Sequence, residues 1–96
     1  MQPHSSHVRG ESTPPLIEDT IGAVLDRAVS RWPDTEALVS VEQGIRWTYA
    51  EFRRRVDEVA AGLLALGLEP GDRVGIWAPN CAEWTLTQFA TARVGL

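Results

Sequence analysis

Residues 48–78 read TYAEFRRRVDEVAAGLLALGLEPGDRVGIWA, and this stretch sets the fold class of the chain. Apolar residues recur at helical spacing through residues 48–67, whereas residues 74–78 form an almost uninterrupted apolar run. A Pro70-Gly71 turn separates the two segments. A strand, a helix, a turn and a second strand buried on both faces predict a right-handed crossover to a parallel neighbour. The predicted fold class is therefore α/β.

The helix predicted in residues 48–67 has signals at both ends. Thr48 and Glu51 form a capping box, in which each side chain accepts a hydrogen bond from the other residue's backbone N–H. Gly67 ends the helix at the position that favours a left-handed backbone. The apolar face comprises Tyr49, Phe52, Val56, Val59, Ala60, Leu63, Leu64 and Leu66.

Three consecutive arginines, residues 53–55, lie on this helix and allow two interpretations. They could form an anion site. However, Glu51, Asp57 and Glu58 balance their charge, and Glu51 precedes Arg55 by four residues, which is the favourable order for an ion pair. We interpret the cluster as a solvated helix face.

A helix and a β-hairpin are predicted upstream. Thr20 fits an N-cap, and Pro33 ends the helix because the residue before a proline disfavours the α region. Residues 37–41 and 45–48 form two strands around a turn that contains a glycine. Trp32 continues the helix's apolar stripe and is interpreted as a core residue rather than a binding aromatic. The stripe comprises Ile21, Val24, Leu25, Ala28, Val29 and Trp32.

After the second buried strand, Pro79 and Asn80 begin a helix predicted over residues 82–94. Asn80 is the candidate ligand residue of this corner, but the corner lacks the glycine spacing and the cation of a phosphate-binding loop, so we interpret it as scaffold. Trp84 lies opposite the main apolar face, so we expect cover on two sides. Arg93 projects from that face and is expected to snorkel or to bind helix carbonyls. The face comprises Ala82, Leu86, Phe89, Ala90 and Leu96.

Composition limits the chemistry further. The 96 residues, 44% of them apolar and 23% charged, make one small globular domain. A net charge of −4 argues against a nucleic-acid-binding face. All nine basic residues are arginine, so no mechanism can use a lysine from this sequence.

The cysteine and histidines suggest no catalytic or metal site. Cys81 is the single cysteine, so no internal disulfide can form. His4 and His7 lie in a polar N-terminal tail, which makes a nucleophile–base pair with Cys81 and a closed zinc site improbable. Residues 1–18 are expected to be flexible and lack the apolar core of a signal peptide, and no segment reaches the length of a membrane span. We therefore expect a cytoplasmic protein.

The string WTYAEFRRRVDEVAAGLLALGLEPGDRVGIWAPNCAEWTLTQFATARVGL, residues 47–96, resembles the N-terminal region of the adenylate-forming acyl-CoA synthetases. The upstream segment SRWPDTEALV fits the same pattern, so the resemblance covers about residues 20–96. Residues 75–92, GIWAPNCAEWTLTQFATA, look most like the branch that activates medium- and long-chain fatty acids. The resemblance implies that residues 19–96 are an incomplete N-terminal portion of the AMP-binding domain, following the tail of residues 1–18.

The resemblance also implies a reaction for a parent protein. A carboxylate attacks Mg-ATP to give an acyl-adenylate and pyrophosphate, and coenzyme A then takes the acyl group. The family's phosphate loop, nucleotide-binding positions, Mg²⁺-binding glutamate and catalytic lysine have no counterpart before Leu96. We therefore expect no catalytic, cofactor-binding or metal-binding residue in this chain and no activity from it alone. The expected partners are the remainder of the ligase chain and, for the parent, a fatty acid with ATP, Mg²⁺ and coenzyme A.

Two alternatives stay open. The chain could be a genuine short protein that binds a partner without catalysis. It could also belong to an adenylation domain that delivers acyl groups to a carrier protein.

Overall fold

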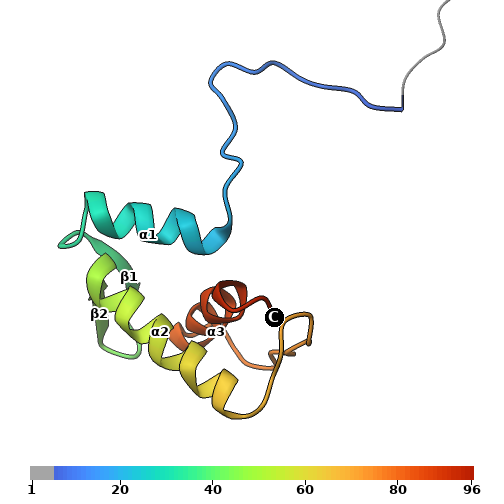
Figure 1. Ribbon diagram of the computed structural model, residues 1–96. Helices are drawn as coiled ribbons and strands as arrows, with labels where there is room; N and C mark the ends of the chain where they lie inside the picture. Colours follow the sequence, from blue (N-terminus) through green and yellow to red (C-terminus); the bar gives the residue numbers. More distant parts are fainter. Residues whose placement is uncertain (1–5) are drawn as a thin grey trace, which may run out of the picture.

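The computed structural model describes residues 6–96 of the chain (Figure 1). Three helices and one hairpin follow in the order α1 (Ile21–Arg31), β1 (Glu36–Ser40), β2 (Ile45–Thr48), α2 (Tyr49–Ala65) and α3 (Ala82–Arg93). This mixed helix and strand content confirms the predicted α/β class. Residues 6–20 run away from the packed elements and contain no helix or strand (Figure 1).

Local signals place the ends of these elements. Thr20 caps α1, because its Oγ1 accepts a hydrogen bond from the Ala23 backbone N–H at 3.1 Å. Thr48 caps α2 through the Glu51 N–H at 3.2 Å. The second half of the predicted capping box is absent from the hydrogen bonds of residues 6–96, because the Glu51 carboxylate accepts from two arginines instead. Gly67 follows α2 with φ of 89°, as predicted.

The core lies where α2 meets both other helices and the hairpin. α2 contacts every other helix and strand, and α1 also contacts α3. Phe52 of α2 meets Phe89 of α3 edge to face, with ring centroids 5.4 Å apart. Val56 of α2 is completely buried. The buried cluster comprises Leu25, Val29, Phe52, Val56, Ala60, Leu86 and Ala90.

The hairpin has the predicted antiparallel pairing. Val39 opposes Arg46 and Ser40 opposes Ile45, with an irregularity between Glu36 and Leu38. The turn uses Gly44 with φ of 66°, a conformation that favours glycine.

The predicted strand at residues 73–78 is wrong for the described part of the chain. These residues are in no ladder, and β1 and β2 form the only sheet within residues 6–96. Val74 and Ile76 are half-buried, whereas the side chain of Trp77 is fully exposed. A parallel strand needs a neighbour to accept and donate its backbone hydrogen bonds, and no element of residues 6–96 takes that place. The predicted crossover is therefore not formed here.

Two side chains on helical apolar stripes also differ from their predicted environments. Trp32 is 50% exposed rather than buried, because α1 ends one residue earlier and Trp32 becomes its C-cap beneath the Arg31 guanidinium. The guanidinium of Arg93, which was predicted to snorkel or to bind helix carbonyls, pairs with Asp26 of α1 and Asp57 of α2.

Candidate functional site

An open groove of about 320 Å³ lies between the hairpin and the start of α3. One wall is β1, and the other is the turn and first helical residues around Cys81 and Trp84. The lining mixes apolar and small polar side chains and includes no charged one. It comprises Leu38, Val39, Ser40, Asn80, Cys81, Ala82, Trp84 and Thr85.

The two walls are joined by the side chain of Gln43, which comes from the hairpin turn. Its Oε1 accepts from the backbone N–H of Ala82 at 2.9 Å and from Ser40 Oγ at 2.8 Å. Its Nε2 donates to both carboxylate oxygens of Glu83, at 3.1 and 3.0 Å. We call this set of contacts among Ser40, Gln43, Ala82 and Glu83 the Gln43 bridge.

The Gln43 bridge also affects the ionisation of Glu83. Hydrogen bonds from its own backbone N–H, from the Gln43 amide and from the Cys81 thiol hold the pKa of the Glu83 carboxyl below its ordinary value of 4.5. A carboxylate in the first turn of α3 is also favourably placed relative to the helix dipole.

The structure brings together only some of the residues that the sequence analysis considered as ligands, nucleophiles or bases. Asn80 and Cys81 both line the groove, with Asn80 exposed and Cys81 half-buried. His4 lies outside the described residues, and His7 belongs to the extended N-terminal segment. Within residues 6–96, no group of three His, Cys, Asp or Glu side chains could hold a metal ion.

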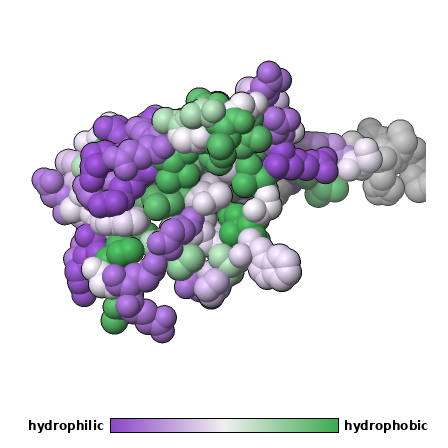
Figure 2. Space-filling view, turned by 90° about the horizontal axis from the view of Figure 1, so that it is seen from below, coloured by the Kyte–Doolittle hydropathy of each residue, from purple (hydrophilic) through white to green (hydrophobic). Residues whose placement is uncertain are grey.

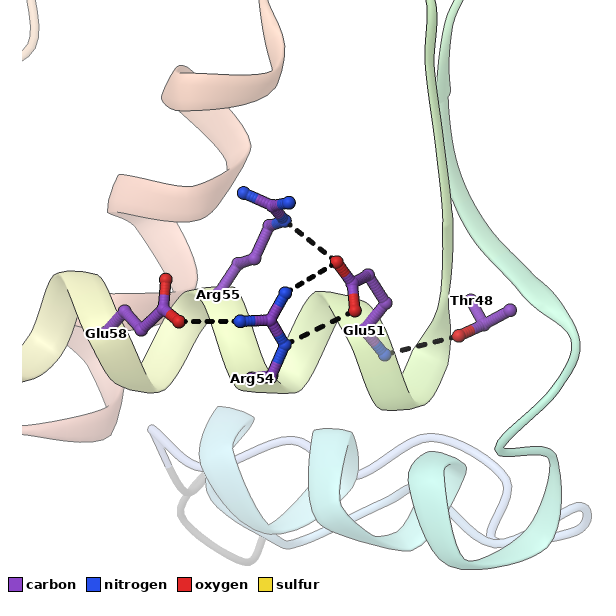
Figure 3. A network of polar contacts seen from close by, with 5 residues as sticks. All are labelled: Thr48, Glu51, Arg54, Arg55 and Glu58. Atoms are coloured by element: carbon purple, nitrogen blue, oxygen red, sulfur yellow. Dashed lines mark hydrogen bonds and ion pairs between the residues drawn. The ribbon is translucent and has the colours of Figure 1, made fainter.

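The arginine cluster forms a charge-compensated network on α2 (Figure 3). Arg54 lies between two carboxylates, with its Nη2 2.8 Å from Glu51 Oε1 and its Nη1 2.7 Å from Glu58 Oε1. Arg55 Nε donates to Glu51 Oε1 at 3.1 Å, and its guanidinium lies 4.8 Å from the ring centroid of Trp47. This arrangement agrees with the solvated, ion-paired interpretation rather than with an open anion site.

The network changes the ionisation of its members in the expected directions. The hydrogen bond from Arg54, helped by that from Arg55 and opposed by partial burial, lowers the pKa of the Glu51 carboxyl. The hydrogen bond to Glu51 and the charges of Glu51 and Glu58 raise the pKa of Arg54. Each group is therefore held in its charged form.

A second surface feature is the apolar side chains that no described element covers. Trp77 is fully exposed, Leu66 is 78% exposed and Leu64 is 48% exposed. Leu64 belongs to α2, and Leu66 and Trp77 belong to the segment that follows it. Figure 2 shows apolar side chains gathered in the middle of the face seen from below rather than scattered among the polar ones. Isolated exposed apolar residues are normal, but a gathered set indicates contact with something else.

Comparison with known proteins extends these observations. Residues 25–96 match the family described as AMP-binding enzyme. The chain is 52% identical over 92 residues to "Medium-chain acyl-CoA ligase ACSF2, mitochondrial" of Danio rerio, a match that covers 96% of this chain and 15% of that protein. It is 44% identical over 80 residues to "Putative acyl-CoA synthetase YngI" of Bacillus subtilis, covering 83% of this chain and 15% of that protein.

Solved structures show the same fold. A Mycobacterium tuberculosis fatty acyl CoA synthetase superposes with a TM-score of 0.76 at 32% identity, over 79% of this chain and 15% of that one. The apo structure of Mycobacterium smegmatis MbtA superposes with a TM-score of 0.74 at 39% identity, over 82% of this chain and 15% of that one. The N-terminal domain of FACL13 from M. tuberculosis gives a TM-score of 0.76 at 32% identity.

The packing of three helices and a hairpin thus matches part of a solved fatty acyl CoA synthetase and part of the N-terminal domain of FACL13. The chain belongs to the family of AMP-binding enzymes. It spans about 15% of the length of the curated relatives that it matches. No helix within residues 6–96 has the length and apolar character needed to cross a membrane.

Proposed function

We propose that this segment is part of an ATP-dependent ligase that joins a fatty acid to coenzyme A. The proposed reaction has two steps. The carboxylate first attacks the α-phosphate of Mg-ATP to give acyl-AMP and pyrophosphate, and the coenzyme A thiol then displaces AMP. Two observations support this proposal: the family match over residues 25–96 and the acyl-CoA ligases among the relatives. The names of several relatives make medium-chain fatty acids the first substrates to test.

We propose that the 96 residues serve as scaffold within that ligase and catalyse nothing alone. Adenylate formation concentrates negative charge on phosphate groups, and enzymes stabilise that charge with cations and metal ions. The lining of the groove includes no charged side chain, and the arginines at positions 54 and 55 are engaged by carboxylates. The sequence contains no lysine.

The proposed partner is the remainder of the ligase chain. The single observation that carries this proposal is the full exposure of Trp77, in an extended segment whose backbone is in no ladder. An indole ring buries 150–250 Å² in a typical core, so a covering element would stabilise this segment substantially. Pairing of residues 73–78 with a further strand would satisfy its backbone groups at the same time.

The test has two parts. The first is the intact mass of the native protein, captured from its own cells with an antibody to residues 1–18. A species several times heavier than 10.6 kDa is expected, and a species of 10.6 kDa would overturn the assignment of the rest of a ligase as the partner.

The second part is pyrophosphate exchange into ATP, measured with octanoate, palmitate and benzoate. The captured protein is expected to exchange with octanoate, whereas purified residues 1–96 are expected to show no exchange. Exchange followed by acyl transfer to a carrier protein, and not to coenzyme A, would favour the adenylation-domain alternative. Robust exchange by residues 1–96 would contradict the scaffold role.

The division into a flexible tail of residues 1–18 and a domain portion from residue 19 is also a proposal, as is a cytoplasmic location. The extended course of residues 6–18 supports the division. Several relatives are named as mitochondrial ligases, so cell fractionation should compare the cytoplasm with the mitochondria directly. Limited proteolysis that cuts before residue 19 and spares the remainder would support the division.

A further inference from the structure

We propose that the Gln43 side chain supplies the capping acceptor that the N-cap residue of α3, Cys81, does not provide, and that the Gln43 bridge holds the hairpin against α3 and limits access to the Cys81 thiol. The proposal concerns a positioning residue from the hairpin turn, 39 positions before the backbone N–H that it caps. It does not depend on the activity proposed above.

The Ala82 N–H, the first of α3, needs an acceptor that the Cys81 side chain does not supply. The first N–H groups of a helix have no partner within the helix, and an N-cap side chain normally accepts from one of them. Cys81 occupies the N-cap position of α3, and its side chain makes no capping hydrogen bond. Thr20 and Thr48, by contrast, cap α1 and α2 themselves. Gln43 Oε1 takes the missing role at Ala82 N.

The Gln43 amide is held by contacts at both of its ends. Ser40 Oγ donates to the same Oε1 at 2.8 Å, while Nε2 donates to the two oxygens of Glu83. Because the Glu83 carboxylate can only accept, it fixes the amide with nitrogen toward Glu83 and oxygen toward Ala82. The hydrogen bonds therefore define one orientation of the amide.

The hairpin depends on this contact for its position relative to α3. It packs mainly on α2 and contacts α3 less extensively, at the end where the groove lies. When the Gln43 bridge opens, β1 and the first turn of α3 can separate without disturbing the α2–α3 core. Cys81 lies half-buried in the groove, between those two walls, so its reactivity reports this opening.

The experiment measures thiol alkylation of Cys81 in the protein as its cells produce it. The native protein and the same protein in urea are labelled with iodoacetamide for different times. Trypsin then releases residues 74–93 between Arg73 and Arg93, a peptide in which Cys81 is the single cysteine. Mass spectrometry of that peptide gives the native rate relative to the unfolded rate, whatever other cysteines the protein has.

Gln43→Ala is expected to raise the native rate about fivefold, because loss of an N-cap acceptor typically has an effect of this size on helix opening. The matched control is Gln88→Ala, which removes an exposed glutamine that lies on α3 and outside the Gln43 bridge. This control is expected to leave the labelling rate of Cys81 within twofold of the original. Equal rates for Gln43→Ala and the unchanged protein would overturn the proposal. So would an unchanged protein that reacts as fast in its native state as in urea.

A charge swap tests the bridge even if Gln43→Ala fails to fold. Gln43→Glu keeps an acceptor for Ala82 N–H but places a second carboxylate against Glu83, so the backbone amides in the first turn of α3 are expected to exchange their hydrogens faster. Adding Glu83→Gln restores one amide and one carboxylate in exchanged positions, and the exchange rate should return to within twofold of the original. A double variant no better protected than Gln43→Glu alone would contradict a specific bridge.

Discussion

Arg93 Nε lies 2.6 Å from Asp57 Oδ1, so the last turn of α3 is ion-paired with the middle of α2. The same guanidinium reaches α1, where Nη1 donates to Asp26 Oδ1 at 3.1 Å. Arg53 Nη1 approaches that Asp26 oxygen at 3.8 Å, so two cations and two carboxylates alternate across the three helices. The Arg93 side chain is 25% exposed and both aspartates are about half exposed, so solvent screens the pairs appreciably.

Arg93→Met should lower the free energy of unfolding by about 1 kcal/mol, because it removes both ion pairs while keeping an unbranched apolar stem. The measurement is urea unfolding followed by tryptophan fluorescence at low protein concentration. Arg73→Met is the matched control, since Arg73 is exposed and makes no ion pair within residues 6–96. Raising the salt concentration should reduce the difference in the free energy of unfolding between Arg93→Met and the unchanged protein, because salt screens the ion pairs. A difference that is independent of salt would show that packing, and not charge, carries the effect.

Gln43→Ala should raise the pKa of Glu83 toward its ordinary value of 4.5, because one of the hydrogen bonds that stabilise the carboxylate is lost. A carboxyl with a lowered folded pKa contributes stability above the unfolded value, and this contribution is lost as the pH falls through the folded pKa. The measurement is an NMR titration of the Glu83 side-chain carboxyl. The control variant Gln88→Ala should leave the pKa of Glu83 unchanged. An unchanged pKa in Gln43→Ala would mean that the Glu83 backbone N–H and the Cys81 thiol hold the carboxylate without Gln43.

Glu51→Gln should flatten the acid-induced loss of stability. The lowered pKa of Glu51 means that its ion pairs are complete above its unfolded value of 4.5 and disappear as the pH falls through the lower folded value. The urea midpoint of the unchanged protein should therefore fall as the pH drops below 4.5, and the urea midpoint of the Glu51→Gln variant should fall less. Arg54→Gln removes the principal ion-pair partner of Glu51 and should weaken the pH dependence of the urea midpoint in the same way. If the double variant is flatter than either single variant, other carboxylates share the effect.

Phe52→Ala should destabilise the fold by about 3–5 kcal/mol, because it removes the ring that contacts Phe89 and leaves a cavity in the core. The Phe52 side chain is 4% exposed, so the cavity is closed to water and its lining loses its partners outright. Leu64→Ala on the same helix is the matched control, since a side chain 48% exposed should cost less than about 1 kcal/mol. Circular dichroism during urea unfolding gives both values. Similar losses for the two variants would show that the core does not centre on Phe52.

The parts of the fold that could be predicted from sequence depend on contacts within a few residues. Thr20 and Thr48 cap helices through backbone groups three positions later, and Gly67 adopts the left-handed conformation that its neighbours require. These signals need no knowledge of tertiary structure. The strand predicted at residues 73–78 fails for the opposite reason, because a strand is defined by a partner and its apolar pattern shows only that the segment can be buried.

The candidate groove was not predictable in the same way. The sequence places Gln43 only in a turn between two predicted strands, and nothing in residues 42–44 indicates a contact 39 positions away. The position of Arg93 did indicate that it binds a polar partner, because a charged side chain on an apolar helix face requires one. The sequence could not identify Asp26 and Asp57 as that partner, because their approach depends on how three helices cross.

Trp77→Ser should have little effect on the stability of the 96-residue chain but should destabilise a longer ligase that contains it. In the 96-residue chain the indole is fully exposed, so its removal should leave the free energy of unfolding within about 0.5 kcal/mol and should reduce self-association. In the longer protein the proposed covering element buries the same indole, and the substitution should destabilise by about 3 kcal/mol or more. Sedimentation velocity and urea unfolding measure the two effects. Val41→Ser, at an exposed position of the hairpin turn, should be close to neutral in both proteins. Neutral behaviour of Trp77→Ser in the longer protein would show that the ligase leaves this surface uncovered, and the partner for residues 73–78 would then have to be a separate molecule.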